Sequence, residues 1–485
     1  MRWHVLDANE AASSAWKNIA ASVVGQWLNW EIDRSAATRA DDVADADAIF
    51  LVHSGSVDWL RSCRSALRRA GVGRRADRRG PDDPLVVTGG PIDAAPATAL
   101  QVADALAVGE AYRLTRALLA ARTPTEALDV ADASPHALTR RAWDPADRDP
   151  DRPWLMRTAA GPLAEPDPWI DWDVPDVRSD DGVIRVIASK GCQLKCGFCA
   201  TTFRQGVARS DDARLIQRVR AHAGDRVQLL SNDPLNVPAF RRLQTRLDHA
   251  SLTVMELADD ANRAAVIRSR PRVVRVGVEG VSPRIRAAFG KPIPDDELLA
   301  HLATLHANRI HTHSFWITGA PFETPADWAD WWTLWDRLTG AVDWGMHRAK
   351  LTCFTPTPPA PLARWLPPHR GDIPDRADIL DRRTASPHLR RILIVTGGRT
   401  PAWRRRCGDQ YGVRPDELPW HATETVDLAP TVDDYRRLPA EVIAWPIPPH
   451  RRWKMADLYR TRMLDTTRPV PQPGRRRRTI PAAAA

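Results

Sequence analysis

Three cysteines are the residues of this chain whose type and spacing most directly predict chemistry. Cys192, Cys196 and Cys199 follow the pattern C-x3-C-x2-C on one short stretch, and the aromatic Phe198 directly precedes the third cysteine. Three thiolates on a short loop can hold three corners of a 4Fe-4S cluster, which leaves the fourth iron open to a substrate or cofactor. The spacing therefore predicts an iron-sulfur site with one open iron.

Two other interpretations of these cysteines are a zinc site and a set of unrelated buried thiols. Zinc prefers four ligands, and no further Cys or His lies within twenty residues on either side of the three cysteines. Unrelated buried thiols would rarely gather in this way in a chain that has six cysteines. A non-catalytic iron-sulfur redox protein also stays open, in which His222, His249 or Cys353 would supply a fourth ligand.

The segments around the cysteines predict a parallel sheet that curves into a partial barrel. We expect strands at 182–188, 226–230, 252–257, 273–278, 312–318 and 344–354, and helices at 211–223, 237–249, 260–268, 295–308 and 325–338. Such alternation is typical of βα units. In barrels of this kind, functional side chains gather at the carboxyl ends of the strands. We therefore expect a partial (β/α)6 TIM-like barrel with the cysteine loop after its first strand.

Two further segments at expected strand ends resemble a known family. Residues 276–282 read VGVEGVS, and residues 315–324 read FWITGAPFET. They resemble the fourth-strand and fifth-strand patterns of the radical S-adenosylmethionine (SAM) superfamily, and the cysteine motif with Phe198 resembles the cluster motif of the same superfamily. The resemblance implies that the open iron binds SAM. It also implies that one electron from the cluster cleaves SAM to a 5'-deoxyadenosyl radical.

The same resemblance implies roles for individual residues near the expected cluster. Asn232, Asp233 and Glu279 would help to hold the amino or ribose groups of SAM. The backbone of Phe198 and of the segment from Gly319 to Pro321 would lie against the adenine ring. The chain reads Ser-Asn-Asp at 231–233 where the family often reads Gly-Gly-Glu, so its contact with the amino group departs from the family pattern.

The first part of the chain predicts a second α/β unit. We expect strands at 3–6, 48–52, 84–88 and 105–108, with helices at 16–28 and 58–70. Strand-helix alternation with glycines at the strand ends predicts an open, doubly wound, Rossmann-like sheet whose ligands bind beyond its carboxyl edge.

This unit resembles the cobalamin-binding domain that precedes the barrel in one branch of radical SAM enzymes. The fingerprint of that domain, D-x-H-x-x-G followed by S-x-L and Gly-Gly, is matched loosely by Asn9, Ser54, Gly89 and Gly90. Asn9 stands where the family has the histidine that binds cobalt. The resemblance implies either cobalamin bound without a lower protein ligand or a scaffold that has lost the cofactor.

The length of 485 residues exceeds what one hydrophobic core supports, so we expect several domains. Composition and patterning divide the chain into a Rossmann-like domain at 1–122, a linker at 123–180 and a barrel at 181–360. A small C-terminal extension at 361–470 and a disordered basic tail at 471–485 follow.

The charge of the chain raises the question of a nucleic-acid partner. The formal net charge is +9, and 63 of the 69 basic residues are arginine, which is typical of GC-rich coding sequence. Nucleic acid is therefore possible but not favoured over a small-molecule or nucleoside substrate. No apolar run is long enough to span a membrane, so we expect a cytoplasmic protein whose Cys63, Cys353 and Cys407 stay reduced.

These observations together predict a radical SAM enzyme with a 4Fe-4S cluster, SAM and cobalamin as cofactors. The preferred reaction is methylation of an unactivated carbon, with a flavodoxin or ferredoxin type reductase as electron donor. The alternatives are a cobalamin-independent rearrangement, a cyclisation, and a nucleoside or tRNA modification. Cys353 is a candidate catalytic thiol because it lies on the last expected strand, although a packed core thiol is the more common role.

Overall fold

The computed structural model of the protein describes most of its two α/β units. The described residues are 1–8, 43, 45–53, 59–89, 96–109, 112–144, 147, 157–163, 176–178, 182–204, 207–234, 237–243, 247, 249–341, 345–355, 357, 360–364, 376–385, 393–396, 454, 458, 459, 461 and 463. The predicted helix at 16–28, the predicted cofactor contacts Asn9, Ser54 and Gly90, the thiol of Cys407 and the predicted tail at 471–485 lie outside these residues.

The N-terminal unit is built on a five-stranded sheet in which the strands lie in sequence order. Its strands are β1 (Trp3–Asp7), β2 (Ala48–Val52), β3 (Leu85–Thr88), β4 (Ala105–Ala107) and β5 (Ala137–Thr139). The first four strands run parallel, and β5 pairs with β4 in the antiparallel direction. The predicted strands are confirmed within one residue at each end.

Described helices cover both faces of this sheet, as the alternating strand-helix pattern predicts. They are α2 (Trp59–Arg69), α3 (Pro96–Ala99), α4 (Tyr112–Leu119) and α5 (Pro124–Asp132). The first two pack with one apolar face of the sheet, and the last two pack with the other. A doubly wound sheet reverses its strand order at a switch point. Among the described strands the order runs one way from β1 to β5, so no reversal lies within them.

The N-terminal unit continues beyond the predicted boundary at residue 122. Helix α5 and strand β5 belong to its core, because Ala127, Ala131 and Ala137 are buried with the strands β1 to β4. These residues were expected in the linker, since they lack long apolar runs. Small alanines are sufficient here because α5 lies close against the sheet.

The larger unit consists of parallel strands that pair in sequence order. They are β9 (Val183–Ile187), β12 (Arg226–Leu230), β13 (His249–Thr253), β14 (Val273–Gly280), β15 (His311–Thr318), β16 (His347–Cys353) and β17 (Leu393–Thr396). Continuous pairing runs from β13 to β17, while β9 and β12 pair with each other. A single parallel bridge from Val227 to Leu247 connects the two groups.

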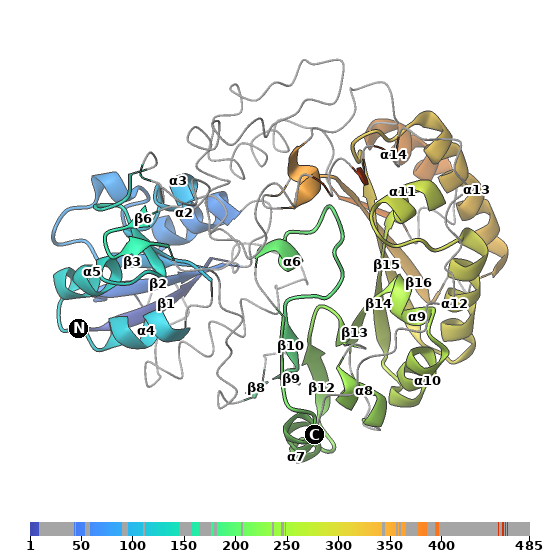
Figure 1. Cartoon of the computed structure of the whole chain (residues 1–485), viewed down its shortest axis with the longest axis horizontal. Coiled ribbons are helices and arrows are strands. Elements are labelled where there is room, and N and C mark those ends of the chain that lie inside the picture. Colours follow the sequence, from blue (N-terminus) through green and yellow to red (C-terminus); the bar gives the residue numbers. More distant parts are fainter. Residues whose placement is uncertain are drawn as a thin grey trace.

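The main helices of this unit lie on the outer side of the curved sheet (Figure 1). They are α7 (Asp212–Ala221), α8 (Pro238–Arg242), α10 (Asp260–Ser269), α12 (Asp295–Ala307), α13 (Pro325–Ala341) and α14 (Arg376–Ala385). Shorter elements are β6 (Arg157–Thr158), β7 (Gly161–Pro162), β8 (Val177–Arg178), β10 (Ser189–Lys190), α6 (Thr201–Arg204), β11 (Ala208–Arg209), α9 (Val254–Leu257), α11 (Pro283–Ala288), and the 3-10 turns Ala76–Arg78 and Pro361–Arg364.

The third predicted strand of this unit is wrong in its position. The strand ends at Thr253, and the predicted strand residues after it form the short helix α9. Thr253 and Glu256 form a capping box, which satisfies backbone donors locally and starts a helix instead of extending the strand. The predicted helix at 237–249 is also too long, because α8 ends at Arg242 and β13 already begins at His249. The sheet further gains β17, which lies beyond the predicted barrel boundary at residue 360.

The hydrophobic core of the larger unit lies between the sheet and the outer helices. Burial alternates along β14 and β15, so that every second side chain packs outward under the helices. Trp328, Trp331 and Trp335 of α13 are each at most 2% exposed. Trp331 and Trp335 pack with Trp316 of β15, and Trp328 packs with Trp331. The other side chains of these strands are partly accessible and face the inner, concave side, where Arg275 and Glu279 lie on the same face as the apolar Phe315 and Ile317.

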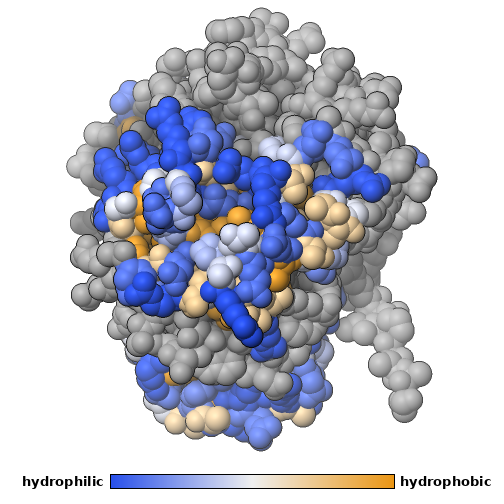
Figure 2. Space-filling model, turned by 90° about the vertical axis from the view of Figure 1, so that its left-hand side faces the viewer, coloured by the Kyte–Doolittle hydropathy of each residue, from blue (hydrophilic) through white to orange (hydrophobic). Residues whose placement is uncertain are grey.

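The two units lie at opposite ends of the structure in Figure 1. The end that carries the N-terminal unit presents mainly hydrophilic side chains with smaller hydrophobic areas between them (Figure 2). No helix among the described residues has both the length and the apolar character that crossing a membrane requires.

Gly280 gives a stability prediction for the end of β14. A Cβ atom at this position would lie 2.5 Å from the backbone nitrogen of Arg286 and 2.8 Å from the carbonyl carbon of Ile285. Both atoms belong to the backbone of α11, so the helix would have to move. We expect Gly280→Ala to lower the free energy of unfolding by about 1–3 kcal/mol, which thermal or urea unfolding would measure. Gly80→Ala is the matched control, because the nearest atom to its Cβ would be 4.0 Å away. Equal stability of the two variants would contradict this expectation.

Candidate functional site

The cysteine loop begins directly after the short strand β10 at the carboxyl end of β9. Gly191 precedes the first cysteine and has a φ of +73°, a conformation that glycine adopts without steric cost. Within the loop, the amide of Cys199 donates to the carbonyl of Cys196 at 3.0 Å. Leu362 closes the loop from the other side, since its amide donates to the carbonyl of Gly197 at 2.9 Å. The loop is thus fixed at both ends of the cysteine motif.

The polar residues after β12 hold the cysteine loop in place. The side chain of Asp233 is fully buried and accepts a hydrogen bond of 3.0 Å from the amide of Gln193. The amide group of Asn232 donates to the carbonyl of Gly191 at 3.2 Å. The structure therefore places both residues against the loop. This is expected, because β9 and β12 are neighbouring parallel strands whose carboxyl ends lie side by side. Their contacts with SAM stay a prediction.

The three thiols of the loop differ in burial. Cys196 is 5% exposed, whereas Cys192 and Cys199 are half-buried. Burial is the main cause that raises the pKa of the Cys192 and Cys196 thiols to about 12. Each of these two thiols also feels the charge of Cys199, so the three sulfurs lie near enough to repel one another as thiolates. A metal centre with positive charge would overcome both costs.

This donor set fits an iron-sulfur cluster. Thiolates are the ligands that such clusters prefer, and three of them on one loop leave one iron open. Within the described part of the chain, no three His, Cys, Asp or Glu side chains converge on one metal ion. The fit therefore rests on the type, spacing and electrostatics of the three thiols and not on a preformed site for a single ion.

Glu279 lies beside the cysteine loop at the carboxyl end of β14. The register of β14 shifts between Gly277 and Glu279, and Glu279 has a φ of +73°, which is rare for a residue with a side chain. This bulge turns its carboxylate toward Lys291, whose ammonium donates to it at 3.0 Å. The same ammonium donates to the carbonyl of Gly277 at 3.0 Å and lies 5.7 Å from the ring centre of Phe198. Lys291 thus connects the end of β14 with the cysteine loop.

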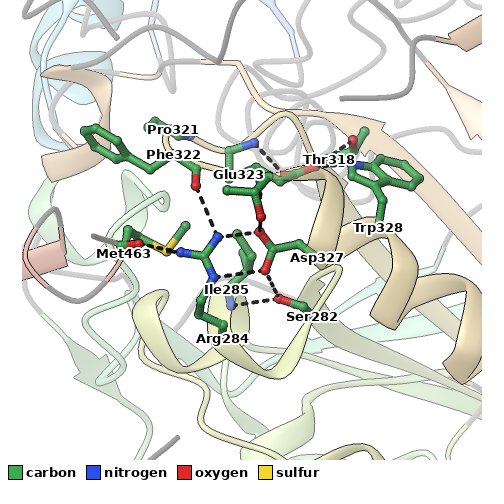
Figure 3. Close-up of polar contacts among 12 residues, drawn as sticks. Ser282, Arg284, Ile285, Thr318, Pro321, Phe322, Glu323, Asp327, Trp328 and Met463 are labelled. Carbon is green, nitrogen blue, oxygen red and sulfur yellow. Dashed lines mark hydrogen bonds and ion pairs between the residues drawn. The ribbon is translucent and has the colours of Figure 1, made fainter. Parts of the chain in front are cut away.

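The segment after β15 forms a tight turn around a buried carboxyl group. Gly319 has a φ of +74°, and the amide of Ala320 donates to Glu323 at 2.9 Å. The indole of Trp328 on α13 donates to the same carboxyl group at 2.6 Å. Glu323 thereby fixes the predicted adenine-binding backbone to the helix that follows it (Figure 3).

The pKa of Glu323 gives a pH prediction. Burial raises the pKa of this carboxyl group from 4.5 to about 7, although donors from the turn partly offset the effect. A group whose pKa is higher in the folded protein stabilises the fold below its unfolded pKa, and this contribution is lost as the pH rises toward 7. We expect wild type to lose up to about 3 kcal/mol relative to Glu323→Gln between pH 4.5 and 7. Urea unfolding of both proteins at several pH values would measure it, and a constant difference would contradict it.

A second polar network, centred on Arg284 and Asp327, also fixes the turn after β15. Arg284 of α11 donates to Asp327 at 3.0 Å, to the carbonyl of Phe322 at 3.2 Å and to the carbonyl of Met463 at 2.6 Å (Figure 3). The hydroxyl of Ser282 donates to Asp327 at 2.6 Å. Burial opposes ionisation of Asp327, but the bonds from Arg284 and Ser282 outweigh it and lower the pKa of the carboxyl group.

The C-terminal residues Tyr459 and Met463 also reach this region. Both are buried in the core of the larger unit, at 3% and 2% exposure. The hydroxyl of Tyr459 donates to the carbonyl of Pro321 at 2.8 Å. Its ring lies 6.1 Å from that of Phe289, and Phe289 lies 4.7 Å from Phe198. A chain of aromatic contacts thus links the cysteine loop to the turn after β15.

The structure brings most of the predicted site residues to one end of the larger unit. Contacts join the cysteine loop to Asn232, Asp233 and Phe198, and Phe198 to Glu279 through Lys291. Sequence reasoning missed Lys291, Arg284 and Tyr459, which have no motif of their own. Lys291 could have been noticed because the chain has only six lysines.

For two other predicted site residues, Cys353 and Gly89, the structure indicates a role in packing. Cys353 is 8% exposed and alternates along β16 with the same parity as the core residues Ala349 and Leu351. Its side chain therefore lies on the buried outer face, while Thr352 lies on the inner face. Gly89 lies close to β4, because a Cβ there would be 3.1 Å from the Cβ of Ala107. Close packing thus accounts for this glycine, and its role toward cobalamin stays a prediction.

Comparison with known proteins identifies the fold. No protein-family model matches the chain, and no curated protein matches it in sequence. The structure of the radical S-adenosylmethionine methyltransferase TsrM from Kitasatospora setae, with cobalamin and a [4Fe-4S] cluster bound, is 12% identical with a TM-score of 0.52. The match covers 73% of this chain and 75% of that chain.

Two further matches are weaker. TsrM with its tryptophan substrate and the SAM analogue aza-SAM bound is 13% identical with a TM-score of 0.47, over 72% of this chain and 73% of that one. The cobalamin-dependent SAM radical enzyme OxsB with aqua-cobalamin bound is 10% identical with a TM-score of 0.44, over 69% and 51%. The first match shows that this chain shares the mixed α/β fold of a cobalamin-binding radical SAM methyltransferase. The predicted resemblance is confirmed at the level of the fold.

Proposed function

We propose that this protein is a radical SAM enzyme that reductively cleaves SAM and methylates a small molecule with the help of cobalamin. Cys192, Cys196 and Cys199 would hold the 4Fe-4S cluster, and the N-terminal unit would hold cobalamin. When bound, the cluster supplies one electron to SAM, and cobalamin carries the methyl group. The observation that carries the proposal is the three-thiol loop at the carboxyl end of β9, in a fold shared with TsrM.

The proposal also includes a specific architecture for each of the two units. Six parallel strands, β9, β12, β13, β14, β15 and β16, with helices outside, would form a partial (β/α)6 TIM-like barrel, and β17 would extend its edge as a seventh strand. The sheet β1 to β5 would be a Rossmann-like unit that binds cobalamin beyond its carboxyl edge. Helices on both faces of that sheet support this assignment.

The described residues support specific tasks in such an enzyme. Asn232 and Asp233 keep the cysteine loop in one conformation through the bonds at 3.2 Å and 3.0 Å. Glu279 would bind the ribose or amino group of SAM, and the turn from Gly319 to Pro321 would lie against adenine. Fixed geometry of this kind places a substrate carbon close to the cofactor and keeps water away from it.

The partners follow from the same chemistry. The electron would come from a flavodoxin or ferredoxin type protein in the cytoplasm, where an oxygen-sensitive cluster survives. The substrate would bind on the inner face of the sheet, where alternate side chains of β14 and β15 are accessible. A small molecule or nucleoside suits such a face better than a folded nucleic acid.

Anaerobic reconstitution tests the proposed function. The full chain would be loaded with iron, sulfide and hydroxocobalamin, passed through gel filtration, and incubated with SAM and a one-electron reductant. We expect corrin absorption bands, about four irons per chain as in one 4Fe-4S cluster, and formation of 5'-deoxyadenosine. A cluster without corrin bands would favour the cobalamin-independent alternatives. An intact cluster that never yields 5'-deoxyadenosine would overturn the enzyme proposal and favour a redox protein.

A further inference from the structure

Lys291 is a buried cation whose position is fixed from three sides. Its side chain is 5% exposed, and its ammonium donates to Glu279 and to the carbonyl of Gly277, both at 3.0 Å. Its backbone is held as well, because its amide donates to the carbonyl of Arg286 at 2.8 Å. Burial of a charge is costly unless it is paired and hydrogen-bonded, and here both conditions are met. The charge of a cation held in this way is screened by solvent much less than the charge of an exposed lysine.

The short segment that carries Lys291 packs directly on the cysteine loop. Phe289 contacts Phe198 with ring centres 4.7 Å apart. A Cβ atom on Gly290 would lie 3.8 Å from the carbonyl oxygen of Lys195. The ammonium of Lys291 lies 5.7 Å from the centre of the Phe198 ring. Three consecutive residues, 289 to 291, therefore line the loop at Lys195 and Phe198, on either side of the second cysteine.

We propose that Lys291 tunes the reduction potential of the cluster that the cysteine loop binds. This inference rests on the proposed function, because it requires that a 4Fe-4S cluster occupies the loop. Reduction adds one electron, and therefore one negative charge, to the cluster. A buried positive charge beside the loop stabilises the reduced state and makes the electron easier to accept.

The net effect on the reduction potential also depends on Glu279, the charge partner of Lys291. Glu279 carries the opposite charge and pulls the potential the other way. The Lys291 ammonium lies 5.7 Å from the centre of the Phe198 ring, and Glu279 is linked to the loop through that ammonium. We therefore expect the cation to act on the loop more strongly than the carboxylate does. Removal of Lys291 should lower the reduction potential and removal of Glu279 should raise it, so the two charges can be tested separately.

The test is a redox titration of the reconstituted full-length protein, followed by electron paramagnetic resonance of the reduced cluster. Lys291→Met removes the charge but keeps most of the side-chain length. We expect reduction to become about tenfold less favourable, which is about 59 mV for one electron. Lys291→Arg keeps the charge and should restore the potential. Glu279→Gln removes the opposing charge and should shift the potential upward.

Controls separate an electrostatic effect from a structural one. Lys454→Met removes the same charge from an exposed position and should leave the potential unchanged. Iron and sulfide are counted in every variant, so that a lost cluster is not mistaken for a shifted one. If Lys291→Met does not fold, an upward shift in Glu279→Gln alone supports the inference, and an unchanged or lower potential overturns it.

Failure of this inference can be told apart from failure of the proposed function. Wild-type protein that holds no 4Fe-4S cluster would remove both. Clusters that form in wild type and in Lys291→Met with the same potential would overturn only the role of Lys291. Shifts of equal sign in Lys291→Met and Glu279→Gln would also overturn it, because distortion and not charge would then be the cause.

Discussion

Cys196→Ala is expected to remove nearly all cluster iron from the reconstituted protein. Cys196 is the most buried of the three loop thiols, and its neighbours contact the segment that carries Lys291. A cluster held by three thiolates loses a third of its protein ligands in this variant, and no thiol replaces the missing one. Iron and sulfide content and the absorption spectrum after anaerobic reconstitution would measure the loss. The formation of 5'-deoxyadenosine should disappear with the cluster.

Cys353→Ala is the matched control for this prediction. Its thiol packs on the buried outer face of β16 with Ala349 and Leu351, so the variant should keep its iron. Loss of the cluster from Cys353→Ala would mean that this thiol is a fourth ligand, which would favour the redox alternative. Retention of a full cluster in Cys196→Ala would contradict the three-thiol site itself.

Arg284→Met is expected to have the largest effect on stability. Arg284 of α11 donates to Asp327 and to the carbonyl of Phe322, which both lie after β15, and to the carbonyl of Met463 near the C-terminal end. It therefore joins three segments of the chain. Asp327 is 3% exposed, so the variant leaves a buried carboxylate without its cation. Breaking such a pair costs about 3–5 kcal/mol in free energy of unfolding. Thermal or urea unfolding would detect this loss.

The same variant should also weaken SAM binding. The turn from Gly319 to Pro321 is held through Phe322, whose carbonyl accepts from Arg284, and through Pro321, whose carbonyl accepts from Tyr459. The variant removes the first contact directly, and it also removes the bond from Arg284 to Met463, which lies near Tyr459 in the chain. Equilibrium dialysis with SAM would measure the change in affinity.

Arg337→Met is the control for Arg284→Met. The ion pair of Arg337 with Asp296 lies at the surface, with side chains 44% and 85% exposed. Exposed pairs contribute at most about 1 kcal/mol, so this variant should behave as wild type. Similar stability losses in the two arginine variants would show that the buried network has no special role.

Local sequence patterns predicted most of the individual elements. The strand at 48–52 is a short apolar run, and its β-structure follows from side-chain type. The helix expected at 260–268 is confirmed within one residue, and the structure shows that the side chain of Asp259 caps its first turn. The strand expected at 252–257 failed, because the capping box of Thr253 and Glu256 outweighs the apolar pattern.

The prediction for the cysteine loop also rests on the sequence alone. Ligand type and spacing are local properties, so Cys192, Cys196 and Cys199 predict a cluster whatever surrounds them. The tertiary structure alone decided which residues act on this loop. Lys291, Arg284 and Tyr459 lie far along the chain from the cysteines, and their contacts depend on how the strands β9 to β17 place their carboxyl ends. A charge or a hydrogen bond acts through distance in space, which residue order does not encode. For this reason the expected cofactor ligands follow from the sequence, while their electrostatic environment follows only from the tertiary structure.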